Sequence, residues 1–245
     1  MVWGMDIPSS FGEFWPEGDF EGVDERGSRG WSKRLIAYYE ENMQEAQKAL
    51  FDDGCGNGAL RYMGHVFGKF THELGTCDEP DSLPLTPIED HEPPTSFDTD
   101  KGYTSLGSLI ALNYGVLAVN EALKAIIERV EPVKHQFFPI EIKMPKGKVF
   151  PERYYILVIG QYIGSFSPAD SRKESWQEPV SGRYSHDESK KGVAGLALSK
   201  VVFGKAHLWR ERGFLGLLTC LSDELEREIA KAGLRIPKHY QMKEA

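Results

Sequence analysis

The stretch LLTCLSDELEREIAKAGL at residues 217–234 decides how the second half of the chain folds. An apolar run leads to Ser222, a residue type that caps helices because its side-chain oxygen accepts a free backbone N–H. Leu225 and Ile229 follow at helical spacing, and Gly233 provides a helix stop. This order predicts a strand, a serine cap and an amphipathic helix whose apolar face packs inward.

The stretch GVLAVNEALKAIIERVEP at residues 115–132 repeats the same pattern. Three positions of the two stretches correspond: Asn120 with Ser222, Leu123 with Leu225, and Ile127 with Ile229. We therefore predict that the C-terminal half contains two strand–cap–helix units. The recurrence agrees with an internal duplication, and equally with two independent segments that meet the same physical requirements.

The rest of the chain predicts an α+β fold in which helices flank a mixed or antiparallel sheet. Aromatic and β-branched residues predict strands at 135–142, 154–163 and 195–203. Helical periodicity predicts one helix over 32–54 and another over 60–75. The apolar face of the first helix consists of Leu35, Tyr39, Met43, Ala46 and Leu50.

Three other segments have the composition of loops. Residues 1–30 are rich in glycine, aromatic and acidic residues, which predicts loops with one short strand. The prolines between residues 76 and 100 predict an acidic linker or wrapping loop. Residues 164–192 are polar and rich in turn formers, and excursions of that length are usually functional or disordered.

The composition is typical of a globular protein of the cytoplasm. A chain of 245 residues with 40% hydrophobic residues can bury a sizeable core. The sequence contains no apolar run of about eighteen residues, and its first segment lacks the basic and apolar regions of a secretory signal. The cysteines Cys55, Cys77 and Cys220 are widely spaced, which favours reduced thiols. We expect neither a membrane span nor secretion.

The net charge of −8 is unevenly distributed along the chain. Seven acidic residues precede Arg26 and nine lie between Lys69 and Lys101, and neither segment contains a Lys or Arg. The remainder carries 21 acidic and 29 basic residues. Such segments form either solvated loops or a surface that attracts a basic partner. Direct binding of nucleic acid through them is disfavoured, because they would repel phosphates.

Motifs that carry catalysis are absent from the sequence. His65 and His72 lie seven residues apart but lack the further ligands of a zinc site, and Cys55 lies in a glycine-rich turn without a protease signature. The chain has no nucleophile elbow and no phosphate-binding loop. We therefore predict no catalytic residue, no metal ligand and no cofactor.

The stretch KAHLWRERG at residues 205–213 gathers a histidine, an indole and two guanidinium groups. In an extended strand His207 and Trp209 share one face, and Leu208 and Arg210 share the other. A general base needs a nucleophile or an orienting acid in a recognisable arrangement, and the sequence shows neither. The stretch therefore favours a packed polar cluster that locks the strand to its sheet.

Several segments together resemble the Imm11-like immunity proteins of bacterial polymorphic toxin systems, over residues 105–235. The segments are LAVNEALKAIIERVEPVKHQFFPIEI, RYYILVIGQYIGSFSPADS and VVFGKAHLWRERGFLGLLTCLSDELEREIAKAGL. The residues that match the family pattern, as framework positions, are Phe138, Pro139, His207, Trp209, Arg210 and Ser222.

The resemblance implies a protein that is not an enzyme and that binds and neutralises a cognate antibacterial toxin. Toxins paired with similar proteins are delivered to rival bacteria, for example by type VI secretion, and include nucleases with basic active-site surfaces. An acidic surface would occlude such a site. The candidate toxin-binding residues are therefore Asp19, Glu21, Asp24, Glu89, Asp90 and Glu92.

The resemblance also predicts two regions and leaves two other functions open. Residues 1–104 would form a helical, partner-specific region rich in acidic loops, and residues 105–245 an immunity-like α+β domain. One alternative is a hydrolase that reverses or prevents toxin damage with His207. The other is an adaptor of a secretion system.

Overall fold

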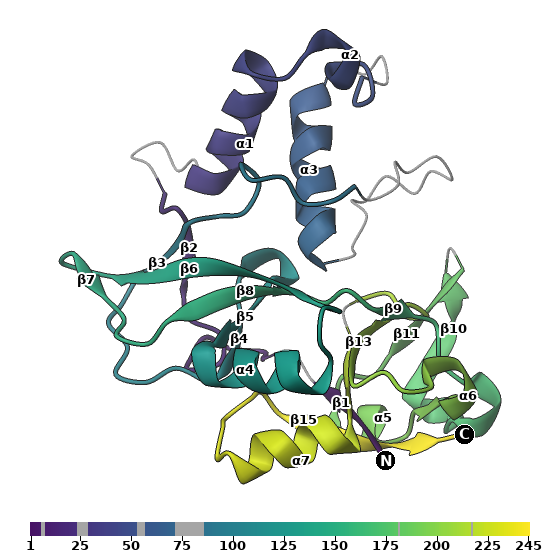
Figure 1. Cartoon of the computed structure of the whole chain (residues 1–245). Helices are drawn as coiled ribbons and strands as arrows, with labels where there is room; N and C mark the ends of the chain where they lie inside the picture. Colours follow the sequence, from purple (N-terminus) through teal and green to yellow (C-terminus); the bar gives the residue numbers. More distant parts are fainter. Residues whose placement is uncertain (6–7, 24–28, 53–56, 72–85, 181, 217) are drawn as a thin grey trace.

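The computed structural model describes residues 1–5, 8–23, 29–52, 57–71, 86–180, 182–216 and 218–245 (Figure 1). Helices and sheets both contribute, which confirms the predicted α+β class. The helices are α1 (Gly30–Glu41), α2 (Glu45–Lys48), α3 (Gly58–Thr71), α4 (Glu121–Val130), α5 (Lys190–Val193), α6 (Lys200–Phe203) and α7 (Asp223–Lys231), with 3₁₀ turns η1 (Asn113–Gly115), η2 (Pro168–Asp170) and η3 (Lys173–Ser175).

The strands form two large sheets and one small hairpin. The central sheet has the order β2-β3-β6-β8-β5-β4, with β7 paired to β6. Its strands are β2 (Gly18–Phe20), β3 (Ser96–Thr99), β4 (Leu109–Ala111), β5 (Leu117–Asn120), β6 (Gln136–Met144), β7 (Lys148–Val149) and β8 (Tyr154–Val158). The terminal sheet has the order β12-β15-β1-β14-β13-β9. Its strands are β1 (Val2–Met5), β9 (Tyr162–Ile163), β12 (Ala197–Leu198), β13 (Leu208–Glu211), β14 (Thr219–Ser222) and β15 (His239–Glu244), and the small hairpin is β10 (Trp176–Val180) with β11 (Arg183–His186).

The two large sheets share a connectivity. In the central sheet, the antiparallel pair β4–β5 leads into α4, and the chain returns as β6, which is parallel to β5 with β8 between them. In the terminal sheet, β13–β14 leads into α7, and the chain returns as β15, parallel to β14 with β1 between them. Each predicted strand–cap–helix unit is therefore part of a larger hairpin–helix–strand unit.

Both predicted helix caps are confirmed. Asn120 Oδ1 accepts the backbone N–H of Leu123 at 3.1 Å, and Ser222 Oγ accepts that of Leu225 at 3.1 Å. Each cap satisfies one of the backbone donors that a helix start leaves without an intrahelical partner. The two helices lie side by side (Figure 1), and Arg129 of α4 pairs with Glu228 of α7 at 2.6 Å.

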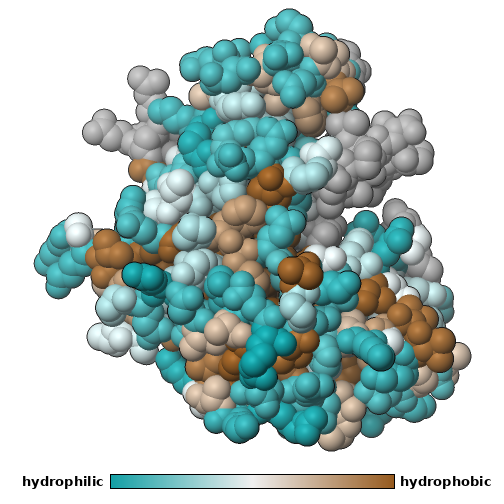
Figure 2. All heavy atoms as spheres, viewed as in Figure 1, coloured by the Kyte–Doolittle hydropathy of each residue, from teal (hydrophilic) through white to brown (hydrophobic). Residues whose placement is uncertain are grey.

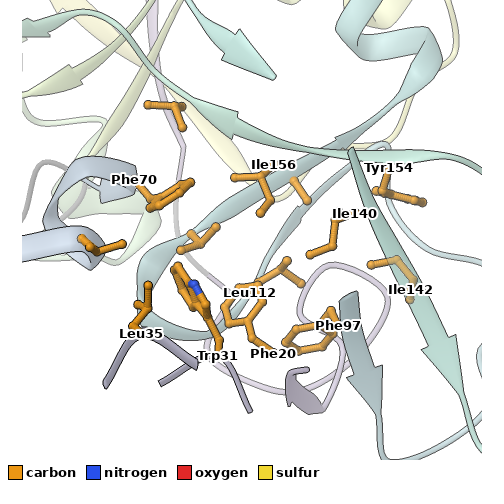
Figure 3. Packing of buried hydrophobic residues seen from close by; sticks show 14 of the residues in the cluster. Phe20, Trp31, Leu35, Phe70, Phe97, Leu112, Ile140, Ile142, Tyr154 and Ile156 are labelled. Carbon is orange, nitrogen blue, oxygen red and sulfur yellow. The ribbon is translucent and has the colours of Figure 1, made fainter. Parts of the chain in front are cut away.

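Three apolar cores hold the layers together. The first lies between the central sheet and the helices α1 and α3, where side chains such as Trp31, Phe70 and Ile156 meet (Figure 3). The second lies between the two sheets and is closed by the apolar faces of α4 and α7. The third covers the other face of the terminal sheet. On β13, Leu208 belongs to the second core and Trp209 to the third, as the predicted alternation of faces requires.

Two of the predicted elements are wrong in extent. The helix predicted over 32–54 is interrupted, because the N–H groups of Asn42 and Met43 both bond to the carbonyl of Tyr38. Gln44 is extended and starts the short helix α2. Leu50, predicted to face inward, is 60% exposed. The strand predicted over 195–203 is only two residues long, and α6 follows it.

All three segments predicted as loops contain more strand than expected, and residues 164–192 contain the hairpin β10–β11. Residues 1–30 supply β1 and β2, and residues 76–100 supply β3, which is parallel to β6. Since β1 pairs within the terminal sheet and β2–β3 extend the central sheet, backbone hydrogen bonds cross the predicted boundary at residue 104. The division into two regions stays a prediction.

The surface is mostly hydrophilic in the view of Figure 2. Hydrophobic residues gather at the lower right of this view, where Figure 1 places α6. Val201 and Val202 of that helix are 91% and 53% exposed. Within the described ranges, no helix combines the length and apolar character needed to cross a membrane.

Candidate functional site

Residues 89–92 form a tight turn, called here the acidic turn, in the segment that lies against α1 and α3. The N–H of Glu92 donates to the carbonyl of Glu89 at 3.0 Å, and the N–H of Glu89 donates to Glu92 Oε2 at 2.8 Å. The backbone and the Glu92 carboxylate therefore close the turn from both ends. Asp90 is exposed, and the side chain of Glu89 is 56% exposed.

A buried ion pair fixes the acidic turn to α3. Lys69 Nζ lies 2.5 Å from Glu92 Oε1, and the two side chains are only 3% and 1% exposed. The same ammonium group donates to the carbonyl of Pro87 at 3.1 Å. Charges buried this deeply are tolerated only when they are paired and hydrogen-bonded. The geometry of the turn is therefore strongly determined.

Helix α1 adds contacts on the other side of the turn. Trp31 Nε1 donates to the carbonyl of Glu92 at 2.7 Å, and Arg34 donates to the carbonyls of His91 and Pro93. The His91 ring stacks on Tyr38 at a centroid distance of 3.5 Å. Burial lowers the pKa of His91, although Glu92 and Glu89 act in the opposite direction, and the lowered pKa favours the neutral ring. These contacts leave the side chains of positions 89 and 90 facing solvent.

The six predicted toxin-binding residues have different environments. Asp19 is 8% exposed and pairs with Arg29 at 2.8 Å. The carboxylate of Glu92 is buried and already paired with Lys69, so it is not accessible to a partner. Glu21 accepts both Nε and Nη2 of Arg34 and the N–H of Thr95. Burial alone would raise the pKa of Glu21, but these hydrogen bonds outweigh it and lower the pKa. These three carboxylates thus serve the fold.

The exposed members of that set are Glu89 and Asp90 of the acidic turn. Glu89 Oε2 lies 3.5 Å from His91 Nδ1, and the carboxylate of Asp90 has no contact partner among the residues that the structure describes. Asp24 lies outside the described residues. Sequence reasoning could not separate Glu89 from Glu92, because the difference arises only from the distant Lys69.

The cluster around His207 has the geometry of a helix start. His207 Nδ1 lies 2.8 Å from Ser222 Oγ, but that oxygen already accepts the N–H of Leu225 as the cap of α7. Glu224 approaches the same Nδ1, at 3.9 Å. In a catalytic triad the acid binds the ring nitrogen opposite the serine, so this arrangement differs from an activated nucleophile.

Trp209 and Arg210, the neighbours of His207 in the motif, are both buried. Trp209 is 0% exposed and stacks on Phe203 at a centroid distance of 4.9 Å. Arg210 donates to Thr219 Oγ1 at 2.7 Å and to the carbonyl of Gly115 at 3.0 Å. The guanidinium group therefore connects the terminal sheet with the turn η1 beside the central sheet.

The sequence reasoning missed Glu131, a buried carboxylate that contacts this motif through the N–H of Leu208. Glu131, at the end of α4, accepts His135 Nε2 at 3.0 Å, Gln161 Nε2 at 2.7 Å and the N–H of Leu208 at 2.8 Å. Burial alone would raise the pKa of Glu131, but these hydrogen bonds hold it below its ordinary value of 4.5. The only sequence signal is an acidic residue four positions before a histidine, which is common on surfaces.

The remaining motif residues, Phe138 and Pro139, lie in β6. Phe138 packs against the first core, with its ring centroid 6.1 Å from that of Phe70. Pro139 pairs with Tyr155 of β8, and β3 joins β6 only from Glu141 onward. The proline is tolerated there because that part of the strand has a ladder neighbour on one side.

Metal-binding and thiol chemistry find little support in the described part of the chain. No group of three or more His, Cys, Asp or Glu side chains in it could hold a metal ion. Cys220 is buried, and burial raises the pKa of its thiol. Cys55, Cys77 and His72 lie outside the described residues.

The model of the immunity protein family Imm11 matches residues 65–244, which is more than half of the chain. The match begins within α3 and therefore includes Lys69 and the acidic turn, upstream of the segment 105–235 that carries the sequence resemblance. The search of curated proteins gives no match.

Proposed function

The chain belongs to the Imm11 immunity protein family, and on that premise we propose that it neutralises one cognate antibacterial toxin by binding it. We further propose that the toxin is a nuclease delivered by a secretion system such as type VI, and that the complex forms in the cytoplasm. Binding would occlude the basic active-site surface of the toxin. Family membership is the observation that carries this proposal.

The charge and rigidity of the acidic turn support it as one contact site for the toxin. Glu89 and Asp90 present two carboxylates on a backbone that buried groups hold in place. A surface that binds nucleic-acid phosphates is basic, so it complements these carboxylates. A preorganised epitope loses little conformational entropy on binding, and charge complementarity accelerates association.

Co-expression with the toxin encoded by the neighbouring gene tests the proposed function. We expect cells that make both proteins to survive and cells that make only the toxin to die. A pull-down should recover the complex, and its affinity should fall as salt concentration rises. Equal killing with and without this protein would contradict the proposal.

A double substitution tests the acidic turn as a contact. Glu89→Gln with Asp90→Asn should weaken toxin binding about tenfold, since contacts between oppositely charged surfaces are lost. The matched control is Glu40→Gln with Glu41→Gln, which also neutralises two adjacent exposed carboxylates. Equal weakening in both variants would mean that only net charge matters, and parent-like binding in the first would move the interface elsewhere.

The alternative hydrolase would have to use His207, whose Nδ1 lies 2.8 Å from Ser222 Oγ. His207→Ala separates the two functions, because a binding inhibitor without that ring still protects the cell. Lost protection with intact folding and intact toxin binding would favour the hydrolase. A secretion-system adaptor would instead associate with secretion components and give no protection.

A further inference from the structure

A pocket of about 470 Å³ opens between the segment before β2 and the turn η1. Three aromatic rings line it, from Phe11, Trp15 and Tyr114, and three carboxylates line it, from Glu17, Asp19 and Asp100. The rings of Phe11 and Trp15 lie 4.7 Å apart, and Phe11 is 49% exposed. Flat rings beside carboxylates are the two surfaces that a guanidinium group prefers.

The charge of the pocket is negative. One lining residue, Arg29, is cationic, and it is paired with Asp19 at 2.8 Å. Glu17 meets Lys101 at 3.4 Å, where both side chains are well exposed, so this pair is weak. The exposed carboxylate of Asp100 has no partner among the residues that the structure describes. The pocket thus retains carboxylates that can receive a further cation.

Arg29 shows which cation the pocket accommodates. Its guanidinium group pairs with Asp19, donates to the hydroxyl of Tyr114, and lies 5.3 Å from the centroid of that ring. The rings of Phe11 and Trp15 and the carboxylate of Asp100 line the same pocket, which therefore contains this combination of groups a second time. A planar guanidinium can stack on a ring and pair with a carboxylate at the same time, which an ammonium group cannot do equally well.

The floor of the pocket is held in a strained conformation. Tyr114 has φ +60° and ψ +21°, which a bulky side chain rarely adopts, and Gly115 follows with φ +73°. The turn is kept in place by Asn113 Nδ2, which donates to the carbonyl of Gly18 at 2.9 Å, and by Arg210, which donates to the carbonyl of Gly115. Strain that surrounding groups maintain is concentrated at binding sites.

We propose that this pocket receives an arginine side chain of the toxin, with the guanidinium group stacked on Phe11 and Trp15 and paired with Asp100. The proposal rests on the proposed function, because it takes the toxin as the source of the arginine. It also assigns the motif residue Arg210 a positioning role, since Arg210 supports the carbonyl of Gly115 from the neighbouring sheet.

A titration with L-argininamide tests guanidinium recognition without the toxin. We expect NMR shifts at the Trp15 indole N–H and at the amides of 113–115, and no such shifts with L-citrullinamide, which keeps the α-amino group and replaces the guanidinium by an uncharged urea group. Asp100→Asn should weaken argininamide binding about fivefold, because one charge-assisted pair is lost. The matched control Glu141→Gln removes an exposed carboxylate from a different pocket, of about 460 Å³, and should bind like the parent. Equal shifts with citrullinamide, or none at these positions, would overturn the proposal.

The second test of the pocket measures binding of the toxin itself. Phe11→Ala with Asp100→Asn should lower toxin affinity about tenfold relative to the parent, while Glu141→Gln leaves it unchanged. Parent-like affinity of the double variant would overturn the pocket proposal and leave the proposed function standing. Absence of toxin binding by the parent would instead overturn the proposed function, and with it the proposal that the arginine comes from the toxin. The argininamide titration would still decide whether the pocket recognises a guanidinium group.

Discussion

Glu92 and Glu131 are both buried carboxylates, but they hold different parts of the molecule. Glu92 pairs with the cation Lys69 and supports a turn whose other acids face solvent. Glu131 accepts two side chains and one backbone N–H, and lies between the unit of α4 and strand β13. A buried carboxylate therefore holds an exposed acidic turn in place at Glu92, and it connects two parts of the fold at Glu131.

The largest expected loss of stability follows from removing the partner of Glu92. Lys69→Met removes the cation and leaves a buried carboxylate without its partner, so we expect a loss of about 3–5 kcal/mol in the free energy of unfolding. Urea denaturation measures it. Adding Glu92→Gln should recover part of the loss, because no isolated charge remains. A loss of less than about 1 kcal/mol would mean that the pair behaves like a surface pair.

A smaller effect is expected at Glu131. Glu131→Gln keeps the shape but replaces one acceptor oxygen by a donor that faces other donors, which should cost about 1–3 kcal/mol. The matched control on the same helix is Glu128→Gln, whose partner Lys124 lies at 2.8 Å on the surface and whose loss should stay within about 0.5 kcal/mol. Equal losses in the free energy of unfolding of the two variants would mean that the buried Glu131 contributes no more than a surface ion pair.

The pH dependence of stability gives a further test of Glu131. Since the folded-state pKa lies below the ordinary value of 4.5, the contribution of Glu131 is present above that pH and is lost as pH falls through the folded pKa. The parent should therefore lose more stability than Glu131→Gln between about pH 6 and pH 3. Glu21, whose pKa is also lowered, contributes equally to both proteins and cancels in the difference. Parallel melting-temperature profiles would contradict the prediction.

The smallest stability effect is expected at the tip of the acidic turn. Glu89→Gln with Asp90→Asn should change the free energy of unfolding by no more than about 0.5 kcal/mol, because both side chains are exposed. Thermal denaturation measures this next to the toxin-binding assay. A large destabilisation would show that these charges serve the fold, and the contrast with Glu92 would disappear.

The sequence predicts those features that depend on near neighbours in the chain. Asn120 and Ser222 cap helices through contacts three residues away, and the alternation of Leu208 and Trp209 follows from strand geometry. Burial of Glu92 depends on Lys69 of the distant helix α3, so Glu89 has the same local sequence pattern but is exposed. Long-range pairing is the part that local patterns do not encode.

The position of β1 has a consequence for the order in which the chain folds. This strand is synthesised before every other strand of the terminal sheet, yet its hydrogen-bond partners β14 and β15 follow it by more than 200 residues. The terminal sheet therefore closes only after β14 and β15 have been synthesised, whereas β4, β5, β6 and β8 can assemble earlier. A nascent chain stalled before β14 would leave the apolar side chains of β1 without their sheet partners, so synthesis of β14 and β15 controls when the terminal sheet can form.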